Sequence, residues 1–280
     1  MTGERVKLEG EIEDILKEFY DFVLVDLRRA RLTAVDYRWR VRRFLKFAGL
    51  EFSREDIRAF LRTLLDKAPR TYANYLKALR CFIRDYLGRP DLIVGFKQPH
   101  VPIEIPGVIP DKKQLKKAFE ALPDVRAKAI FLFIASTGLR KCEVLRLKRE
   151  DVDWDLRCVK ARFESRTKKM GIAFFNEEAE EWLKKYLTTR KDDKPKLFRI
   201  GTENFKAIWK TASKAAGVKI TPHVLRKWHA TTLIEAGVPG EIVDIFQGRA
   251  PRSILARHYL RPKLKELKAI YDRAGLRILS

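Results

Sequence analysis

Residues 221–226 read TPHVLR, and this short stretch predicts the start of a helix that presents chemistry. Thr221 is a good N-cap, and Pro222 fits the first helical position because its missing N–H would have no partner there. His223 and Arg226 then share one face of the first turn, where free amides and the helix dipole favour an anion. The stretch therefore predicts a proton-transfer group beside a bidentate phosphate ligand. A capping histidine next to a surface arginine is the alternative.

Upstream of this helix, an apolar helix is predicted from Val125 to Ser136, ending at Gly138. Glycine at that point permits the left-handed backbone with which many helices end. Arg140 follows within the sequence TGLRKCEVLRL, and Glu143 lies three residues further on, where its carboxylate could hold the guanidinium. Taken alone, the pattern is equally typical of a helix end followed by a surface arginine.

Two tyrosines near the end of the chain are candidate nucleophiles. Tyr259 lies in the basic sequence ARHYLRP, which would favour a phenolate next to a phosphate. A packed aromatic ring with a hydrated hydroxyl is the alternative for this residue. Tyr271 belongs to a regular apolar helix that starts near Lys263, so a role in core packing is expected there.

Apolar periodicity predicts a mainly α-helical protein with a small β-sheet. Two strands, residues 158–163 and 172–175, flank a polar turn that reads ESRTKKMG. Prolines at positions 99, 102, 106 and 110 interrupt the helical pattern and favour a semi-extended linker. We therefore expect two domains, with a helical domain over residues 1–97, a linker over 98–110 and a second domain over 111–280.

The charge of the chain indicates a polyanionic partner. Lys and Arg number 60 against 37 Asp and Glu, a formal charge of +23, which favours nucleic acid over a merely soluble basic protein. The longest apolar run, residues 129–135, is too short to cross a bilayer, and the first residues contain no apolar signal sequence. We therefore expect a cytoplasmic, nucleoid-associated protein that does not bind a membrane.

Neither a metal ion nor another cofactor is expected. The sequence has no carboxylate cluster with nuclease-type spacing and no glycine-rich phosphate loop of the GxxxxGK[ST] kind. Its three cysteines form no CxxC pair, so a zinc ribbon is not predicted either.

Basic side chains concentrate in the predicted N-terminal domain. Residues 1–27 carry 3 basic and 8 acidic groups, whereas eight basic groups and one aspartate lie between Arg28 and Lys46. A helix expected to begin at a capping box over Thr33–Asp36 carries several of them, and a helix from about Thr71 carries more. Each could belong to a solvated face, but their concentration favours phosphate contact. The expected DNA-binding residues are Arg38, Arg40, Arg42, Arg43, Lys77, Arg80 and Arg84.

Together these motifs resemble, in order and spacing, the tyrosine recombinase (integrase) family over most of the chain. TGLRKCEVLRL is similar to the family's first-arginine motif, which implies catalytic roles for Arg140 and Glu143. HVLR matches its H-x-x-R motif, with His223 and Arg226. SRTKKMG resembles the hairpin that carries the family's lysine. Lys168 is the better match for that lysine, and Lys169 is the alternative.

The last motif departs from the usual pattern. FQGR stands where the family has L-G-H, so Arg249 replaces a histidine or tryptophan, and Tyr259 follows ten residues later as the implied nucleophile. Integrases of archaeal viruses and plasmids often depart from the bacterial pattern here, so the resemblance is to that branch. Arg249 would assist by charge, because an arginine cannot act as an acid or base near neutral pH.

The resemblance implies a SAM-like core-binding domain followed by a tyrosine-recombinase catalytic domain. Tyr259 would attack a DNA phosphodiester to form a 3′-phosphotyrosyl link, while Arg140 and Arg226 neutralise the phosphorane and Lys168 protonates the 5′ oxygen. The implied partners are a specific duplex DNA target and further copies of the chain, four protomers on two duplexes. The segment after Tyr259 would dock on a neighbouring protomer or on its own.

The implied function is integration and excision of a mobile element. A Xer-like chromosome-dimer resolvase is the alternative within the family. A type IB topoisomerase-like enzyme or a non-catalytic DNA-binding protein of the same fold are the alternatives outside it.

Overall fold

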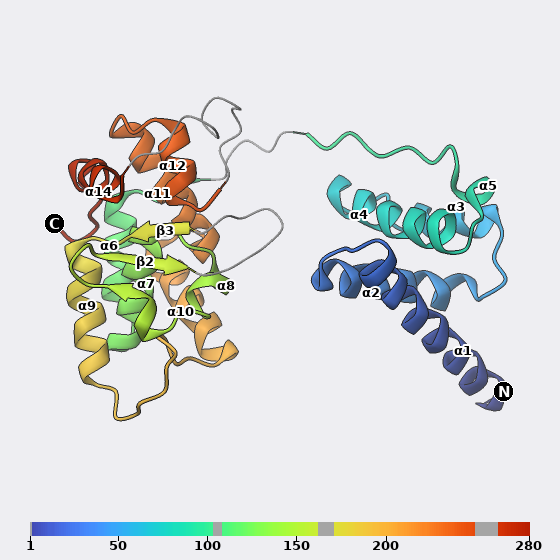
Figure 1. Ribbon diagram of the computed structural model, residues 1–280. Helices are drawn as coiled ribbons and strands as arrows, with labels where there is room; N and C mark the ends of the chain where they lie inside the picture. The colour runs from blue at the N-terminus through green and yellow to red at the C-terminus, as the bar shows by residue number, and fades with distance from the viewer. Residues whose placement is uncertain (1, 103–107, 162–170, 250–262) are drawn as a thin grey trace. The chain divides into compact units, whose positions relative to one another are not determined.

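A computed structural model describes residues 2–102, 108–161, 171–249 and 263–280 (Figure 1). The chain divides into two compact units, Met1–Ile105 and Pro106–Ser280, so the division falls inside the proline-containing stretch 98–110. Helices dominate both units, and the strands of the described residues all belong to the second unit. The protein is thus mainly α-helical with a small sheet, as the sequence predicts.

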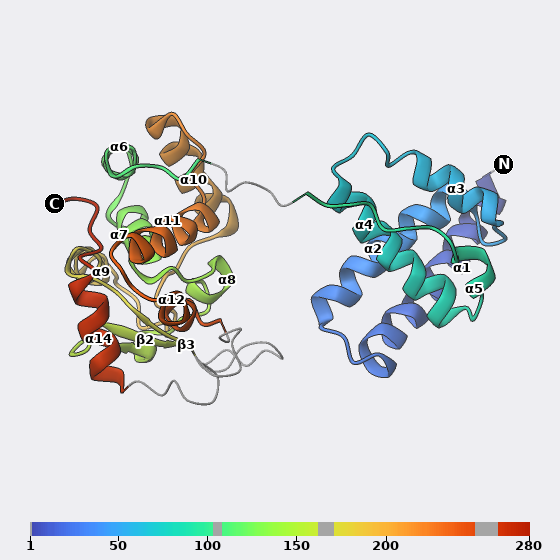
Figure 2. The ribbon, with the colours of Figure 1, turned by 90° about the horizontal axis from the view of Figure 1, so that it is seen from above.

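The first unit is a helical bundle (Figure 2), and its hydrophobic core contains several packed aromatic rings. Phe19 packs edge-on against Phe82 with ring centroids 5.1 Å apart, and Phe44 packs in the same way against Phe60 at 5.4 Å. Such pairs add stabilisation beyond the area that they bury. The elements of this unit are α1 (Thr2–Asp21), η1 (Phe22–Asp26), α2 (Arg31–Ala48), α3 (Arg54–Arg62), α4 (Pro69–Arg80), η2 (Cys81–Tyr86) and α5 (Pro90–Ile93).

The predicted start of α2 at Thr33 is wrong. The helix begins at Arg31 after Ala30 as N-cap, and the Thr33 amide donates to the Ala30 carbonyl at 2.8 Å. Thr33 therefore lies inside the first turn and does not cap it. Arginine and leucine have high helix propensity, so Arg31 and Leu32 extend the helix towards the N-terminus.

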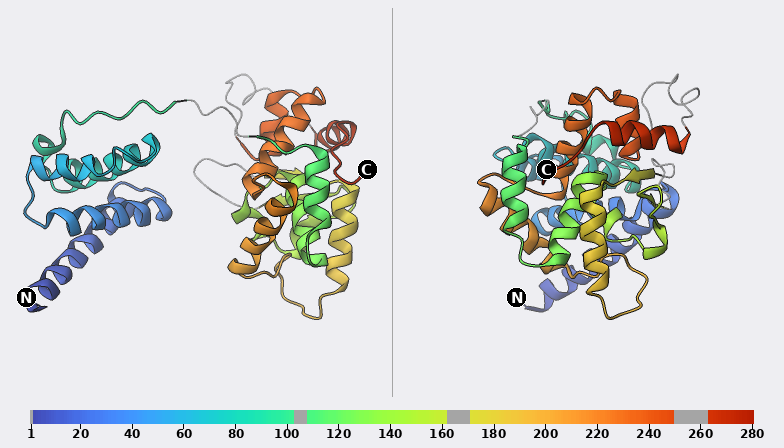
Figure 3. Two further views of the ribbon diagram at one scale, coloured as in Figure 1. Left: turned by 180° about the vertical axis from the view of Figure 1, so that it is seen from behind. Right: turned by 90° about the vertical axis from the view of Figure 1, so that its left-hand side faces the viewer.

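The second unit packs helices around the apolar helix α7 and a three-stranded sheet (Figure 3). Helix α9 lies beside α7 along its length, and α11 packs against another part of α7. The helical elements are α6 (Lys112–Glu120), α7 (Val125–Thr137), α8 (Lys141–Val144), η3 (Arg149–Asp151), α9 (Glu177–Thr188), α10 (Thr202–Ala216), α11 (Pro222–Glu235), α12 (Gly240–Phe246) and α14 (Leu264–Arg273).

The sheet has the order β1-β2-β3 and is antiparallel throughout. Strands β2 (Cys158–Ala161) and β3 (Gly171–Phe174) confirm the two strands predicted from the sequence, with Val159 opposite Ala173. Strand β1 (Val152–Asp153) was not predicted, because two residues are too few to display a period of two. The stretch that joins β2 to β3, with Lys168 and Lys169, lies outside the described residues.

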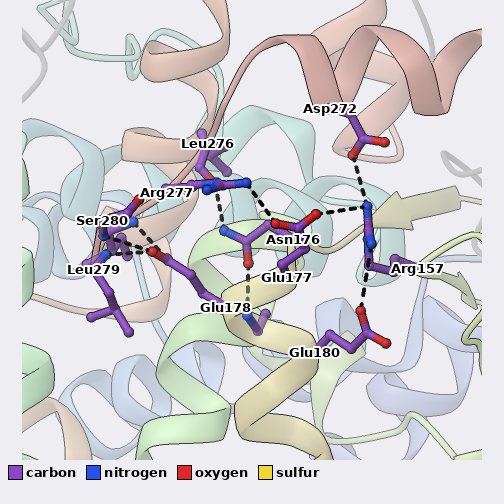
Figure 4. Close-up of polar contacts among 12 residues, drawn as sticks. Arg157, Asn176, Glu177, Glu178, Glu180, Asp272, Leu276, Arg277, Leu279 and Ser280 are labelled. Carbon is purple, nitrogen blue, oxygen red and sulfur yellow. Dashed lines mark hydrogen bonds and ion pairs between the residues drawn. The ribbon is translucent and has the colours of Figure 1, made fainter.

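The C-terminal segment docks on its own unit (Figure 4). Tyr271 of α14 packs with Phe174 of β3 and Phe246 of α12 in one aromatic cluster. Beyond α14, the Glu178 carboxylate accepts hydrogen bonds from the amides of Ile278, Leu279 and Ser280. The described tail is therefore an integral part of this unit's fold in the single chain.

Candidate active site

Arg140 is held at the end of α7 by a buried carboxylate. Gly138 ends the helix with a φ of +60°, and the chain turns so that Arg140 precedes the short helix α8. Glu143 is 4% exposed, and its carboxylate accepts from the Arg140 amide at 2.7 Å and from Arg140 Nη1 at 3.2 Å. The contact expected from the sequence is therefore present. It leaves the guanidinium half-exposed and oriented.

Helix α11 begins as predicted and places Arg226 in the interior. The Thr221 hydroxyl caps the helix by accepting from the Val224 amide at 3.2 Å, and Pro222 is its first residue. Arg226 is 3% exposed and donates from Nη1 to the Gly138 carbonyl at 2.6 Å and from Nη2 to the Gln247 carbonyl at 2.8 Å. One guanidinium thus joins the ends of α7 and α12 to the first turn of α11.

The cationic groups of the three motifs gather at one place. Burial, followed by the charges of Arg140 and Arg249, lowers the pKa of Arg226. The pKa of His223 is lowered as well, mainly by burial and then by the cations Lys227, Arg226, Arg249 and Arg140. Both shifts have the sign that a concentration of positive charge produces. An anion bound there would relieve the repulsion, so the arrangement suits a phosphate.

Arg249 enters this cluster from the turn after α12. Its amide donates to the Asp244 carbonyl at 2.8 Å, and its guanidinium lies 3.4 Å from the Asp244 carboxylate. The side chain is 49% exposed, so the ion pair is weak and Arg249 keeps the freedom to contact a ligand. Sequence motifs separated by up to 109 positions, from Arg140 to Arg249, are thus brought together by the fold.

Two buried residues of the site were missed in the sequence. Gln247 and His229 are both fully buried. Gln247 Nε2 donates to the Arg226 carbonyl at 2.9 Å and lies 3.3 Å from His229 Nδ1. Gln247 is part of the quoted FQGR motif, but its side chain carries no charge to draw attention. His229 lies at a buried position of α11, three residues after Arg226. This helical spacing is the signal in the sequence that could have pointed to it.

Comparison with known proteins decides the family. The model of the phage integrase family matches residues 110–266, more than half of the chain. The chain belongs to the phage integrase family. Tyrosine recombinase XerA of Pyrococcus furiosus is 28% identical over 276 residues, which cover 94% of each protein, and XerA of Thermococcus kodakarensis is 26% identical over 285 residues, covering 95% of this chain and 97% of that protein. The protein is accordingly a tyrosine-type site-specific recombinase.

Solved structures of the same fold include DNA complexes. The integrase of the Tn1549 transposon with a circular intermediate DNA has a TM-score of 0.64 at 16% identity, covering 92% of this chain and 98% of that one. A lambda integrase dimer bound to a core site has a TM-score of 0.63 at 16% identity, covering 86% and 95%. At these identities the likeness concerns the fold alone.

Of the two late tyrosines of the recombinase, the described residues include Tyr271 alone. Tyr259 lies outside the described residues, as do Lys168 and Lys169. Tyr271 is 1% exposed, and its hydroxyl donates to the Ser136 carbonyl at 2.8 Å. Burial also raises the pKa of this phenol. A phenol that is enclosed, hydrogen-bonded and hard to ionise is a poor nucleophile, so Tyr271 has the core role that its helix predicts.

The basic residues of the recombinase's first unit are tied to neighbours. Glu13 of α1 pairs with both Arg38 and Arg42 of α2. Arg43 donates to the Tyr75 hydroxyl at 2.7 Å and stacks on the exposed ring of Trp39. The other contacts join Arg40 to Asp36, Arg80 to the Phe96 carbonyl and Arg84 to Asp85, while Lys77 lies on an exposed part of α4.

Within the described ranges, no cluster of three or more His, Cys, Asp or Glu side chains has the arrangement of a metal site. None of the helices there is long and apolar enough to span a membrane.

The buried histidine predicts an acid-sensitive fold. Burial, and then the Arg226 charge, lowers the pKa of His229 from 6.5 to about 3. The folded state therefore keeps the ring neutral while the unfolded chain protonates it, so the stabilisation is complete above pH 6.5 and is lost as the pH falls towards 3. Between pH 7.5 and pH 5 this group should remove about 2 kcal/mol from the free energy of unfolding.

Urea titrations at both pH values measure this effect. The variant His229→Asn should lose that part of the pH dependence, whereas His100→Asn, at an exposed position, should keep it. Equal pH dependence in all three proteins would contradict the assignment.

Proposed function

We propose that this recombinase cleaves and rejoins duplex DNA at a specific target site through a 3′-phosphotyrosyl intermediate. The observation that carries the proposal is the convergence of Arg140, His223, Arg226 and Arg249 in one cationic cluster, in which Arg226 is buried and the other three side chains reach solvent. Arg226 makes its hydrogen bonds there to carbonyl oxygens, which orient its charge without cancelling it. A guanidinium held in this way can stabilise a phosphorane through its charge and fork geometry.

The proposed step exchanges one phosphate ester for another. The Tyr259 oxygen bonds to phosphorus, the bond from phosphorus to the 5′ oxygen breaks, and the departing oxygen takes a proton from Lys168, or from Lys169 if that is the lysine used. The Tyr259 proton passes to His223, whose lowered pKa leaves the ring neutral and able to accept it. The reverse sequence, with a different 5′ hydroxyl, rejoins the strand, so the ester energy is conserved.

The biological role that we propose is integration and excision of a mobile element. Arg249 in place of the usual histidine supports the resemblance to integrases of archaeal mobile elements. The second candidate is Xer-like resolution of chromosome dimers, which the names of the XerA relatives favour. In either role we propose that four protomers act on two duplexes in the nucleoid.

Sequencing of trapped DNA tests the proposal. The protein is incubated with a pool of random nicked duplexes, denatured in SDS, and the DNA that remains attached is sequenced. A single enriched sequence joined through its 3′ end is the expected result. Absence of attached DNA would overturn the proposal, and attachment without sequence preference would favour a type IB topoisomerase-like enzyme.

Two plasmid assays then separate the roles. With the selected site on two separate circles, an integrase fuses them, whereas a resolvase acts efficiently when two direct repeats lie on one circle. Preferential fusion supports the mobile-element role, and strict resolution supports the Xer-like role.

We further propose that α2 of the first unit contacts the phosphate backbone, with Glu13 competing for its arginines. Glu13 lies 3.1 Å from Arg38 and also pairs with Arg42, so DNA must displace it from both. The variant Glu13→Gln should therefore bind the selected duplex more tightly, by roughly 3- to 10-fold, the equivalent of one or two surface ion pairs.

Fluorescence anisotropy over a range of salt concentrations measures this change. Glu18→Gln is the matched control, because Glu18 lies on the same helix and accepts from the Tyr86 hydroxyl at 2.8 Å. Unaltered affinity in Glu13→Gln would remove Arg38 and Arg42 from the interface. If they do contact phosphates, replacing each with alanine should flatten the salt slope by about 0.9.

A further inference from the structure

We infer that Gln247 and His229 are positioning residues, which fix the direction of the Arg226 guanidinium for phosphate binding. The inference rests on the proposed function, because the value of a fixed direction lies in the anion that Arg226 would hold. Neither residue touches the proposed phosphate through a contact in the structure. Their effect would act through Arg226.

Gln247 holds Arg226 at both of its ends. Its side-chain Nε2 donates to the Arg226 backbone carbonyl at 2.9 Å, and its own backbone carbonyl accepts from Arg226 Nη2 at 2.8 Å. Arg226 and Gln247 are 21 positions apart on different helices. The double link therefore fixes both the position of the Arg226 backbone and the orientation of its guanidinium. A residue locked at both ends loses little freedom when a ligand binds.

His229 supports this link from the other side. Its Nδ1 lies 3.3 Å from Gln247 Nε2, which has only hydrogens to offer, so Nδ1 is the acceptor and the proton of the neutral ring is on Nε2. The same ring packs on Gly138, where an added Cβ would lie 2.7 Å from Nδ1. Gly138 supplies the carbonyl that accepts from Arg226 Nη1 at 2.6 Å. One imidazole thus supports both residues whose carbonyls receive the guanidinium fork.

The polarity of the pair is what separates positioning from simple packing. Buried residues of the second unit are overwhelmingly apolar, yet a glutamine and a histidine occupy this place at full burial. Among the described residues Gln247 Oε1 has no hydrogen-bond partner, a cost that an apolar side chain would avoid. A carboxylate in place of the amide would neutralise Arg226. A neutral amide and a neutral imidazole hold the cation and leave its charge for a ligand.

Single-turnover cleavage of the selected duplex tests the inference in the full-length protein. Gln247→Met removes both donated hydrogen bonds at similar length, and cleavage should slow about 10- to 100-fold, the range expected when a reacting group is misplaced by an ångström. Affinity for the duplex, measured by anisotropy, should stay within about twofold, because most binding comes from other phosphate contacts. His229→Leu should slow cleavage as well. His229→Asn, whose Oδ1 replaces the Nδ1 acceptor, should restore most of the rate.

Phosphorothioate substrates supply a readout that a packing role would not move. Replacing the non-bridging oxygen that Arg226 contacts with sulfur should slow cleavage by the wild-type protein. This loss of rate, the thio effect, should be smaller in Arg226→Lys. The same decrease is expected in Gln247→Met. A slower Gln247→Met enzyme with the full thio effect would overturn the inference, as would a wild-type rate.

The outcomes remain distinct from those of the proposed function. If the wild type forms no covalent adduct at all, the proposed function fails. If the wild type forms the adduct and Gln247→Met keeps the wild-type rate or the full thio effect, only the positioning role fails. Should Gln247→Met not fold, as judged by circular dichroism, the comparison of His229→Asn with His229→Leu decides the question, and equal rates in these two would overturn it.

Discussion

Replacing Tyr259 with phenylalanine should abolish covalent attachment to DNA while leaving DNA binding intact. The substitution removes one oxygen, which is the atom that would bond to phosphorus, and no other side chain supplies an equivalent nucleophile in the proposed step. Loss of a covalent nucleophile lowers rates on the order of 10⁵-fold or more in well-studied enzymes, so no adduct should be visible on a denaturing gel.

Tyr271→Phe is the matched control. Its hydroxyl donates to the Ser136 carbonyl inside the core, so this variant should keep cleavage and lose stability, by about 1 kcal/mol for one buried hydrogen bond. Adducts that persist in Tyr259→Phe and vanish in Tyr271→Phe would reverse the assignment of the nucleophile. Adducts in both variants would show that a different residue attacks.

Local patterns in the sequence predict much of the second unit correctly. Helix α7 begins at Val125 and ends at Gly138, and helix α11 begins at Pro222 after the Thr221 cap, as the sequence predicts. The contact between Arg140 and Glu143 was also predictable, because it spans three residues and depends on local geometry alone. The start of α2 was missed because a possible cap at Thr33 was outweighed by helix-forming residues before it.

Non-local contacts set the limit of such prediction. The carbonyl of Gly138 receives Arg226 across 88 positions of sequence, and no periodicity indicates that pairing. Gln247 and His229 were not predicted for the same reason, because their role depends on contacts with Arg226 and with each other that are not local in sequence. The candidate site residues could be named from motif order, whereas the residues that orient them could be found only from the fold. The roles of Tyr259 and Lys168 stay predictions, because both lie outside the described residues.

Arg226 should be the most sensitive of the described site residues. In Arg226→Ala the phosphorane would lose a fork of two donors, and cleavage should fall on the order of 10²- to 10³-fold, as when an oxyanion donor is removed. The Gly138 and Gln247 carbonyls would also lose their donor, at a cost of about 1–3 kcal/mol for each buried group left unpaired. Part of any loss of activity in this variant would therefore come from a weakened fold.

Arg226→Lys separates the two effects. Lysine keeps the charge and can still donate to one of the two carbonyls, but it cannot reproduce the planar fork that reaches the Gly138 and Gln247 oxygens together. Because one carbonyl stays unpaired, we expect a stability loss of about 1–3 kcal/mol, about half that of Arg226→Ala, and a cleavage rate that remains at least about tenfold lower. Arg199→Lys, an exposed arginine of the same unit, should change neither quantity. If Arg226→Lys cleaves at the wild-type rate, the site needs only a positive charge at this position, and the fork has no part in stabilising the transition state.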